Sequence, residues 1–346
     1  MSRRWIECVP NISEGVDIEI IESIVEVARQ IPSVAVLGCE PDPDYNRTVI
    51  TLAGEWGPVA RGALAIIQKS AELIDMRNHT GNHPRMGAVD VCPFVPISPG
   101  TEEDCLKAAS FVQDELNGLV PIYLYGEAST HPSRHSLANL RRGQYEGLEN
   151  RILGGEWEDE NTRMPDSWSG HWGETESKFG AVAIGVRPVL VAYNVNVNEV
   201  EPLASKAAGS IVRSSGRLLK SPTGNKVRAS GMLDSVQGMG VPLPSHGICQ
   251  VSMNLQNYSV TPMHVAYECV RSICADHDVE LCGSELVGLV PLQAMLESGS
   301  WYTSGEELSE SELVDAAISN LGLSYLGEFD PHNRIIEWAI KNELGE

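Results

Sequence analysis

The sequence has no long hydrophobic run: no uninterrupted apolar stretch approaches the ~20 residues of a membrane-spanning helix. The opening residues MSRRWIECVPN also lack the apolar core of a signal peptide. We therefore expect a cytoplasmic protein that does not contact membranes. Hydrophobic residues still make up 42% of the 346 residues, which excludes a disordered chain. At ~150 residues per domain, the length predicts about two domains.

Positive charge is also scarce, because 25 lysines and arginines stand against 47 acidic residues, for a net charge of -22. Such a field repels nucleic acids and anionic membranes, so we expect neither as a partner. An acid excess with few lysines fits both adaptation to high salt and an ordinary acidic enzyme.

Several motifs of known chemistry are missing. The eight cysteines have no CxxC spacing, and several lie in apolar runs, which predicts buried, reduced thiols. The segments VQGMG and GSELVGLVP fit neither a dinucleotide fingerprint nor a P-loop, and no GxSxG motif is present. We therefore expect no nucleotide site and no serine nucleophile elbow.

Apolar periodicity predicts a mixture of helices and strands. Helical spacing or capping residues place helices over 18–31 and after Thr101, Thr261 and Ser309. Short apolar runs bounded by turn residues predict strands at 34–39, 47–53, 120–125, 189–196 and 248–255. The last two alternate, so each should have one buried and one wetter face.

Two stretches depart from this pattern. Residues 147–180 are rich in Gly, Trp, Glu, Asp and Pro, which indicates a domain boundary or a long functional loop. Residues 213–231 carry five basic side chains around the turn SPTGN. We interpret this second stretch as a solvated loop, with a contact for an anionic ligand as the alternative.

The segment IDMRNHTGNHPRMGAVDVCPF (74–94) holds two histidines four residues apart. On a helix this spacing could present two metal ligands, but Gly81 and Pro84 disfavour a helix and the zincin glutamate is missing. We expect no metal site. Pro84 instead holds His83 in an extended loop, where an imidazole near Arg85 suits proton transfer beside an anionic substrate. The alternative is a histidine with a structural role only.

The segment EPDPDYNRT (40–48) gathers Glu40, Asp42 and Asp44 before Arg47. Carboxylates can orient a histidine or stabilise its protonated form. In a proline-containing turn they can equally be solvated turn formers. These residues alone do not decide between the two roles.

Seven segments together carry a family resemblance: ECVPNISEG, NRTVITLAG, LIDMRNHTGNHPRMGAVDVCPFVP, YLYGEA, AIGVRPVLVAYNVN, VQGMG and GSELVGLVP. In this order they resemble glutamate formiminotransferase, which in animals is the N-terminal half of formiminotransferase-cyclodeaminase. The resemblance extends to about residue 325. It implies transfer of the formimino group from N-formimino-L-glutamate to N5 of tetrahydrofolate, in the degradation of histidine to glutamate.

The resemblance also implies an architecture and partners. The fold would be α+β, with two ferredoxin-like α/β subdomains related by duplication, at residues 1–180 and 181–326, and a helical tail at 327–346. The protein would be a homodimer of one-carbon metabolism. Its co-substrate would be tetrahydrofolate, without a metal.

The family's catalytic histidine, in its H-P-R-M-G motif, corresponds to His83. Its partner acid, six residues before N-R-T, corresponds to Glu40, where the animal enzyme has Asp. Asp42 is close enough in sequence to compete for that role. Arg47, Arg85 and Arg187 are candidates to bind the substrate carboxylates by bidentate pairing, and Asp42 is a further candidate for substrate binding.

The folate-contacting segment of the family corresponds by position to His171, Trp172, Gly173, Glu174, Thr175, Glu176, Ser177, Lys178, Phe179 and Gly180. Only the last two match well, so this assignment depends mainly on position. Two alternative functions stay open. One is an enzyme of the same scaffold that acts on 5-formyltetrahydrofolate. The other is a folate-binding protein without catalysis.

Overall fold

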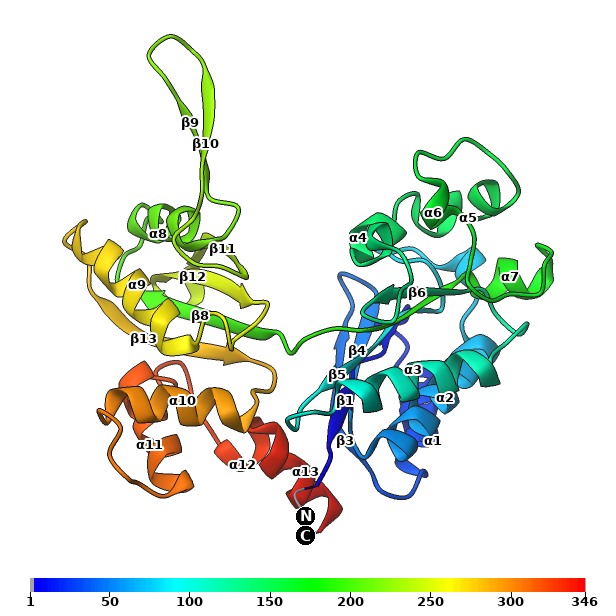
Figure 1. The fold of residues 1–346 in the computed structure, drawn as a ribbon, viewed down its shortest axis with the longest axis horizontal. Coiled ribbons are helices and arrows are strands. Elements are labelled where there is room, and N and C mark those ends of the chain that lie inside the picture. The colour runs from blue at the N-terminus through cyan, green and yellow to red at the C-terminus, as the bar shows by residue number, and fades with distance from the viewer. Residues whose placement is uncertain (1–2, 346) are drawn as a thin grey trace. The chain divides into compact units, whose positions relative to one another are not determined.

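The computed structural model describes residues 3–345, which fold as two compact units. The first comprises the residues up to Arg187 together with those from Glu343 onward, and the second covers Pro188–Asn342. Each unit combines helices with its own β-sheet, as expected for an α+β fold (Figure 1).

The first unit begins with a βαββαβ arrangement whose first strand is broken in two. Its elements are β1 (Ile6–Cys8), β2 (Asn11–Ile12), α1 (Ile18–Arg29), β3 (Val34–Asp42), β4 (Arg47–Gly54), α2 (Trp56–Leu73) and β5 (Val89–Pro96). The antiparallel order across the sheet is β3, β4, the β1–β2 strand, then β5. This is the ferredoxin-like order.

An extension widens this sheet. The helix α3 (Glu102–Glu115) leads to β6 (Ile122–Gly126), and β7 (Val182–Val186) pairs in parallel with both β5 and β6. Between β6 and β7 lie only short helices: η2 (Pro132–Arg134), α4 (Leu137–Leu140), α5 (Gln144–Ile152), α6 (Glu160–Arg163) and α7 (Glu174–Phe179). The compositional shift at 147–180 therefore marks this irregular insertion.

The helices α1, α2 and α3 cover one face of the first sheet. Ile24, Ile66 and Val112 from the three helices are fully buried in one core with Ile50 and Leu52 of β4. Because side chains alternate along a strand, the residues of β4 that alternate with Ile50 and Leu52 point to the opposite face of the sheet. That other face positions the candidate site.

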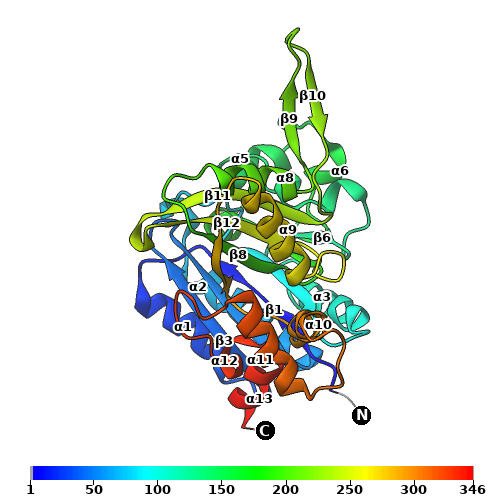
Figure 2. The same cartoon turned by 90° about the vertical axis from the view of Figure 1, so that its left-hand side faces the viewer.

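The second unit repeats the same order in β8 (Val191–Val197), α8 (Ala204–Val212), β11 (Val236–Leu243), β12 (Ile248–Leu255), α9 (Met263–Ala275) and β13 (Leu281–Val287). Its antiparallel sheet runs β11, β12, β8, β13. α8 and α9 pack on one face of this sheet (Figure 2). The two units therefore share the ferredoxin-like topology, as a duplication implies. The following helices are α10 (Leu292–Tyr302), α11 (Glu310–Leu321), α12 (Pro331–Arg334) and α13 (Ile336–Leu344).

The basic stretch 213–231 forms a hairpin rather than an irregular loop. β9 (Arg217–Lys220) pairs with β10 (Lys226–Ala229), and the hairpin projects from the second unit (Figure 2). The SPTGN segment supplies the turn, with Gly224 at φ +85°. All residues of these two strands except Ala229 are exposed, so the prediction of a solvated surface is confirmed.

The predicted helix signals differ in how they act. Ser309 and Glu312 bond to each other's backbone N–H groups at the start of α11, and Gly322 ends that helix in the left-handed conformation. Thr101 precedes α3 as predicted, but its hydroxyl donates to the carbonyl of Ser98 and does not cap the helix. The prediction of the helix was correct, and that of its cap was wrong. All eight cysteines are free thiols, and five of them are buried.

Candidate active site

His83 lies in a loop that is pinned to the β3–β4 turn. The Asn46 side chain accepts the Gly15 N–H (2.9 Å) and donates to the Thr80 carbonyl (2.8 Å), while His79 Nε2 lies 3.0 Å from the Asn46 carbonyl. At Gly81 a Cβ would fall 2.5 Å from the Tyr45 carbonyl oxygen, so this close approach requires glycine. The loop is therefore fixed by hydrogen bonds and by close backbone contact.

The His83 side chain is 18% exposed and stands between a cation and a carboxylate. Its Nε2 lies 3.3 Å from Arg47 Nη1 and 3.8 Å from Asp90 Oδ2. The Tyr45 ring meets the imidazole edge-on, with ring centroids 6.1 Å apart. The imidazole thus retains access to solvent while its ring nitrogen faces charged groups.

Burial and nearby positive charge lower the pKa of His83 from 6.5 to about 4. Burial contributes most, followed by the charges of Arg47, Arg141 and Arg85, while Asp42 acts in the opposite direction. His83 is therefore neutral near pH 7, and it can accept a proton there.

Asp90 is a member of this cluster that the sequence reasoning missed. Its side chain is 1% exposed; Oδ1 accepts the Met86 N–H (3.0 Å) and Arg141 Nε (3.2 Å), and Oδ2 pairs with Arg141 Nη2. Burial raises the pKa of Asp90 against the opposing effect of Arg141. A lone acid in the apolar run AVDVCPFV was the available signal, because a buried charge needs a partner.

Arg47 opens β4 directly opposite Asp42, the last residue of β3. One Arg47 nitrogen faces His83, and its guanidinium carbon lies 5.9 Å from the centre of the Tyr45 ring. Its Nε is buried and has no hydrogen-bond partner. Because buried donors are normally paired, this nitrogen could bind an acceptor on a ligand.

Glu40 and Asp42, the two candidate partner acids, lie on the same face of β3. Arg47, which pairs in register with Asp42, lies on that face too. Half-buried Asp42 accepts the N–H groups of Asp44 and Tyr45, both at 3.0 Å, and its charge acts on His83. Glu40 is exposed, and it pairs in register with Val49, two residues after Arg47 on β4. The structure describes no direct contact between Glu40 and His83.

Arg85 is held within the protein. Its side chain is 7% exposed and pairs with both carboxylate oxygens of Glu146, at 3.0 and 2.6 Å, and its Nε donates to His79 Nδ1 (3.1 Å). This pairing lowers the pKa of Glu146. Both ring nitrogens of His79 are also engaged, so the Arg85 and His79 side chains brace the loop around His83.

Arg187 lies at the far end of the sheet from this cluster. It follows β7, and its N–H donates to the carbonyl of Phe94 (3.2 Å), near the end of β5. Asp90 lies near the beginning of β5, and β5 and β7 are parallel. The backbone of Arg187 is thus separated from that of Asp90 by much of the length of β5.

The segment 171–180 forms α7 and its flanks, beside the strand that follows the His83 loop. Gly180 bridges Gly87, where a Cβ would fall 2.4 Å from the Ala181 carbonyl oxygen. Phe179 is buried, and its carbonyl accepts the Ala88 N–H (2.7 Å). The C-terminal end of this predicted folate segment is therefore fixed against the entry to β5.

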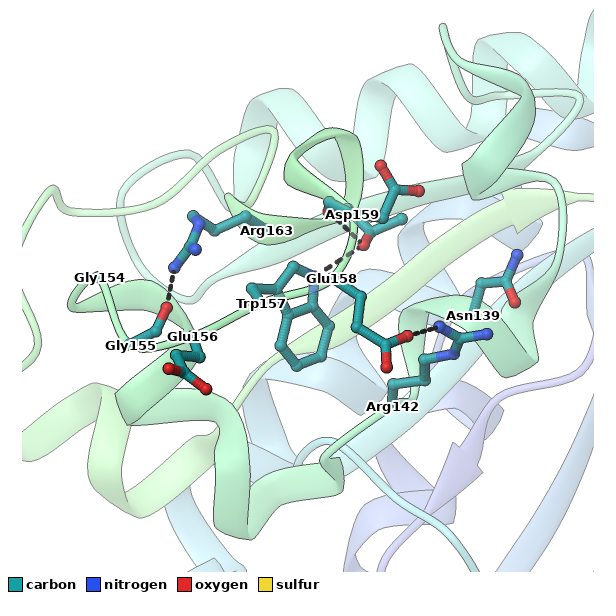
Figure 3. Close-up of a pocket in the computed structure, with 10 residues that line it drawn as sticks. Asn139, Arg142, Gly154, Gly155, Glu156, Trp157, Glu158, Asp159 and Arg163 are labelled. Carbon is teal, nitrogen blue, oxygen red and sulfur yellow. Dashed lines mark hydrogen bonds and ion pairs between the residues drawn. The ribbon is translucent and has the colours of Figure 1, made fainter.

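A cavity of about 1150 Å³ opens elsewhere in the first unit (Figure 3). Trp157 stands in its wall and donates through Nε1 to Thr162 (2.9 Å), and Arg142 pairs with Glu158 (2.5 Å). The lining residues are Asn139, Arg142, Gly154, Gly155, Glu156, Trp157, Glu158, Asp159, Thr162 and Arg163. None of the predicted site residues is among them.

Two further features are absent from the part of the chain that the structure describes. Residues 3–345 contain no group of three or more His, Cys, Asp or Glu side chains that could hold a metal ion. Over the same range, no helix is both long and apolar enough to span a membrane.

Each unit matches a family model of the formiminotransferase domain. The N-terminal subdomain of the formiminotransferase domain matches residues 5–187, and the family model of the formiminotransferase domain matches residues 192–341. These two ranges fall within the first and second unit respectively.

Relatives of two lengths are similar to this chain. Formimidoyltransferase-cyclodeaminase of Rattus norvegicus is 39% identical over 97% of this chain, which spans 60% of that relative's length. Glutamate formimidoyltransferase of Thermoplasma acidophilum is 36% identical over 90% of this chain and 96% of its own. The enzyme of the same name from Streptococcus pyogenes is 33% identical, over 87% of this chain and 94% of its own. The chain belongs to the formiminotransferase family.

Proposed function

We propose that this protein is a glutamate formimidoyltransferase, which moves the formimino group from N-formimino-L-glutamate to N5 of tetrahydrofolate. This reaction belongs to one-carbon metabolism and to the degradation of histidine to glutamate. Similarity to bacterial and archaeal relatives of that name supports the proposal over nearly their whole length. The observation that carries it is the neutral, partly exposed imidazole of His83, held beside Arg47 and Asp90.

The reaction needs one group that can both take and return a proton. N5 of tetrahydrofolate attacks the formimino carbon and gives its proton to His83. This attack forms a tetrahedral intermediate at the formimino carbon. His83 then returns the proton to the glutamate nitrogen as the bond from that nitrogen to carbon breaks. The products are glutamate and 5-formiminotetrahydrofolate. A single imidazole can perform both steps, and holding two substrates together supplies further rate.

The cationic surroundings of His83 prepare the site for an acidic donor. N-formimino-glutamate has two carboxylates, and Arg47 has one buried donor without a partner. A carboxylate bound there would offset the guanidinium charge that lowers the pKa of His83. Substrate binding should therefore raise this pKa toward neutrality, where acid–base catalysis is most effective.

Glu40 is our proposed partner acid, with Asp42 as its rival. Glu40 is supported by its position before the N-R-T motif, and Asp42 by its charge acting on His83. Asp90 is already paired with Arg141 and is better suited to fixing that cation in place. Of the substrate-binding arginines, Arg47 has the most support, since Arg85 is held by Glu146 and Arg187 lies at the other end of β7.

The remaining parts of the proposal concern folate and the assembly. Residues 171–180 contact folate as a co-substrate, supported by their attachment at Gly180 to the strand after the His83 loop. The protein acts as a homodimer in the cytoplasm, and the eight free thiols fit a reducing compartment. No metal takes part in this mechanism.

The function is tested by mixing purified protein with tetrahydrofolate and N-formimino-glutamate and following the folate absorbance spectrum and the release of glutamate. We expect both products in equal amounts. A parallel assay with 5-formyltetrahydrofolate tests the alternative one-carbon unit. Turnover only of the formyl compound, or of neither substrate by folded protein, would contradict the proposal.

A further inference from the structure

The sheet of the second unit has a polar face built from three amides and one carboxylate. On β8, Asn194 and Asn196 alternate with Tyr193, whose buried side chain lies on the opposite face. In register, Gln250 of β12 stands opposite Asn196, and Glu285 of β13 stands opposite Asn194. Three neighbouring strands therefore bring these four side chains together, and we call them the amide cluster.

Hydrogen bonds fix the orientation of the amide cluster. Gln250 Nε2 donates to Asn196 Oδ1 (2.8 Å) and to Glu285 Oε2 (3.1 Å), and Asn194 Nδ2 donates to the same carboxylate oxygen (3.3 Å). Asn196 is fully buried and Gln250 is 5% exposed. Glu285 is thus held in place by two amides on neighbouring strands.

Two polar atoms of the amide cluster are available for further hydrogen bonds. Asn196 Nδ2 is buried and has no hydrogen-bond partner. Within residues 3–345, both hydrogen bonds described for the Glu285 side chain go to Oε2, so Oε1 still has room for a donor. Because buried polar groups are normally satisfied, an orphaned amide donor in the same cluster as an available carboxylate oxygen indicates a ligand that completes them.

The chemistry of the cluster selects the kind of ligand. A carboxylate binds best to a planar group that presents two adjacent N–H donors, as an amidine or a guanidine does. Both substrates of the proposed function have such an edge: the 2-amino-4-oxo ring of tetrahydrofolate and the formimino group of the donor. We propose that Glu285, oriented by Asn194 and Gln250, binds an amidine-type edge of a substrate. This inference rests on the proposed function.

The surroundings of the cluster favour the pterin ring over the smaller donor. The cross-strand row that contains Glu285 and Asn194 continues through Ser252 to Met239 on β11. The Met239 side chain is 59% exposed. A row with a carboxylate at one end and an exposed thioether at the other matches a flat ring with a polar edge and an apolar body.

The test measures binding without turnover, in the full-length protein. Each substrate is added alone, with 5-formyltetrahydrofolate as a stable folate, and its dissociation constant is measured by calorimetry. Glu285→Gln keeps the size of the side chain and removes the charge, and we expect it to weaken folate binding by about 10- to 100-fold. Glu285→Asp should recover part of this loss. Glu280→Gln, an exposed glutamate just before β13, is the matched control and should bind folate normally.

The two binding measurements, one with the folate and one with N-formimino-glutamate, show which substrate edge Glu285 binds. Weaker binding of the folate alone assigns the pterin ring, and weaker binding of N-formimino-glutamate alone assigns the formimino group; either supports the inference. Unchanged binding of both by a folded Glu285→Gln variant would overturn it. If the unmodified protein bound neither substrate, the proposed function itself would fail, which is a different result from the loss expected in the variant.

Discussion

The two units have the same strand order and the same helix-covered face, yet the opposite faces of their sheets differ in chemistry. In the first unit that face presents Glu40, Asp42 and Arg47, and Arg47 lies beside His83. In the second, Glu285 is the only charged residue within β8, β11, β12 and β13. One topology therefore carries a titratable face and an amide face.

This difference follows from what each kind of group can do. Charges within a few ångströms change the pKa of a histidine, and proton transfer depends on that pKa. Amides keep their hydrogen-bonding character at every pH near neutrality, so they are suited to recognition. We therefore expect changes in the first unit to alter rate and pH dependence, and changes in the second unit to alter binding or stability.

The largest effect is expected for His83→Ala. Removing the group that we propose moves the proton should lower kcat by ~10²–10⁴-fold, the usual contribution of a positioned acid–base group. The side chain lies in a loop pinned by other residues, so the circular dichroism spectrum should stay unchanged. Steady-state rates check this, and near-normal turnover by a folded variant would remove His83 from the mechanism.

A smaller loss should follow from Glu40→Gln. The substitution keeps the shape and removes the charge that we propose stabilises protonated His83, so kcat should fall by about 10- to 100-fold. Glu40 is exposed, so the melting temperature should not change, and the exposed Asp44→Asn is the matched control. Glu40→Asp should recover part of the rate. A normal rate for Glu40→Gln with a large loss for Asp42→Asn would transfer the role to Asp42.

Arg47→Gln tests the electrostatics of the first unit directly. Since the guanidinium charge lowers the pKa of His83, its removal should raise that pKa from about 4 toward 6.5. A histidine titration by NMR in the absence of substrate measures this, and KM for N-formimino-glutamate should also rise. Glu285→Gln should leave the titration of His83 unchanged. Equal titration curves for Arg47→Gln and the unmodified protein would contradict this account of the low pKa.

Sequence patterns predicted the local elements well because local signals are short-ranged. The periodicity of 18–31 predicted α1, and the alternation of 189–196 predicted the two faces of β8. The Thr101 hydroxyl was wrongly expected to cap a helix, because a nearby carbonyl of Ser98 takes its hydrogen bond. Such competition depends on the backbone path and is not visible in the sequence.

The site was only partly predictable, for a physical reason. Pro84 and its neighbouring glycines marked the loop that carries His83. The pairing of Asp90 with Arg141 joins residues 51 positions apart, and the pairing of Arg85 with Glu146 joins residues 61 apart. No local pattern reveals such long-range pairs, so the arginine that faces His83 could not be distinguished from the one that braces its loop.

The smallest effect is expected for a histidine of the second unit. His264 of α9 is 8% exposed and stacks on Trp301, with ring centroids 5.1 Å apart and planes 20° apart. Burial lowers its pKa, with Glu268 opposing, but no arginine contributes as in the case of His83. His264→Gln should therefore leave turnover within about twofold of normal and lower the melting temperature by a few degrees through lost stacking.

The pH dependence of stability separates this structural role from a catalytic one. Because the folded pKa of His264 lies below 6.5, the unfolded chain binds its proton first, and stability falls as pH drops below about 6.5. In His264→Gln that fall should be shallower, which melting curves at about pH 7.5 and about pH 5.5 would measure. A loss of turnover as large as that of His83→Ala would mean that proton chemistry is not confined to the first unit, and the two units would no longer differ in this role.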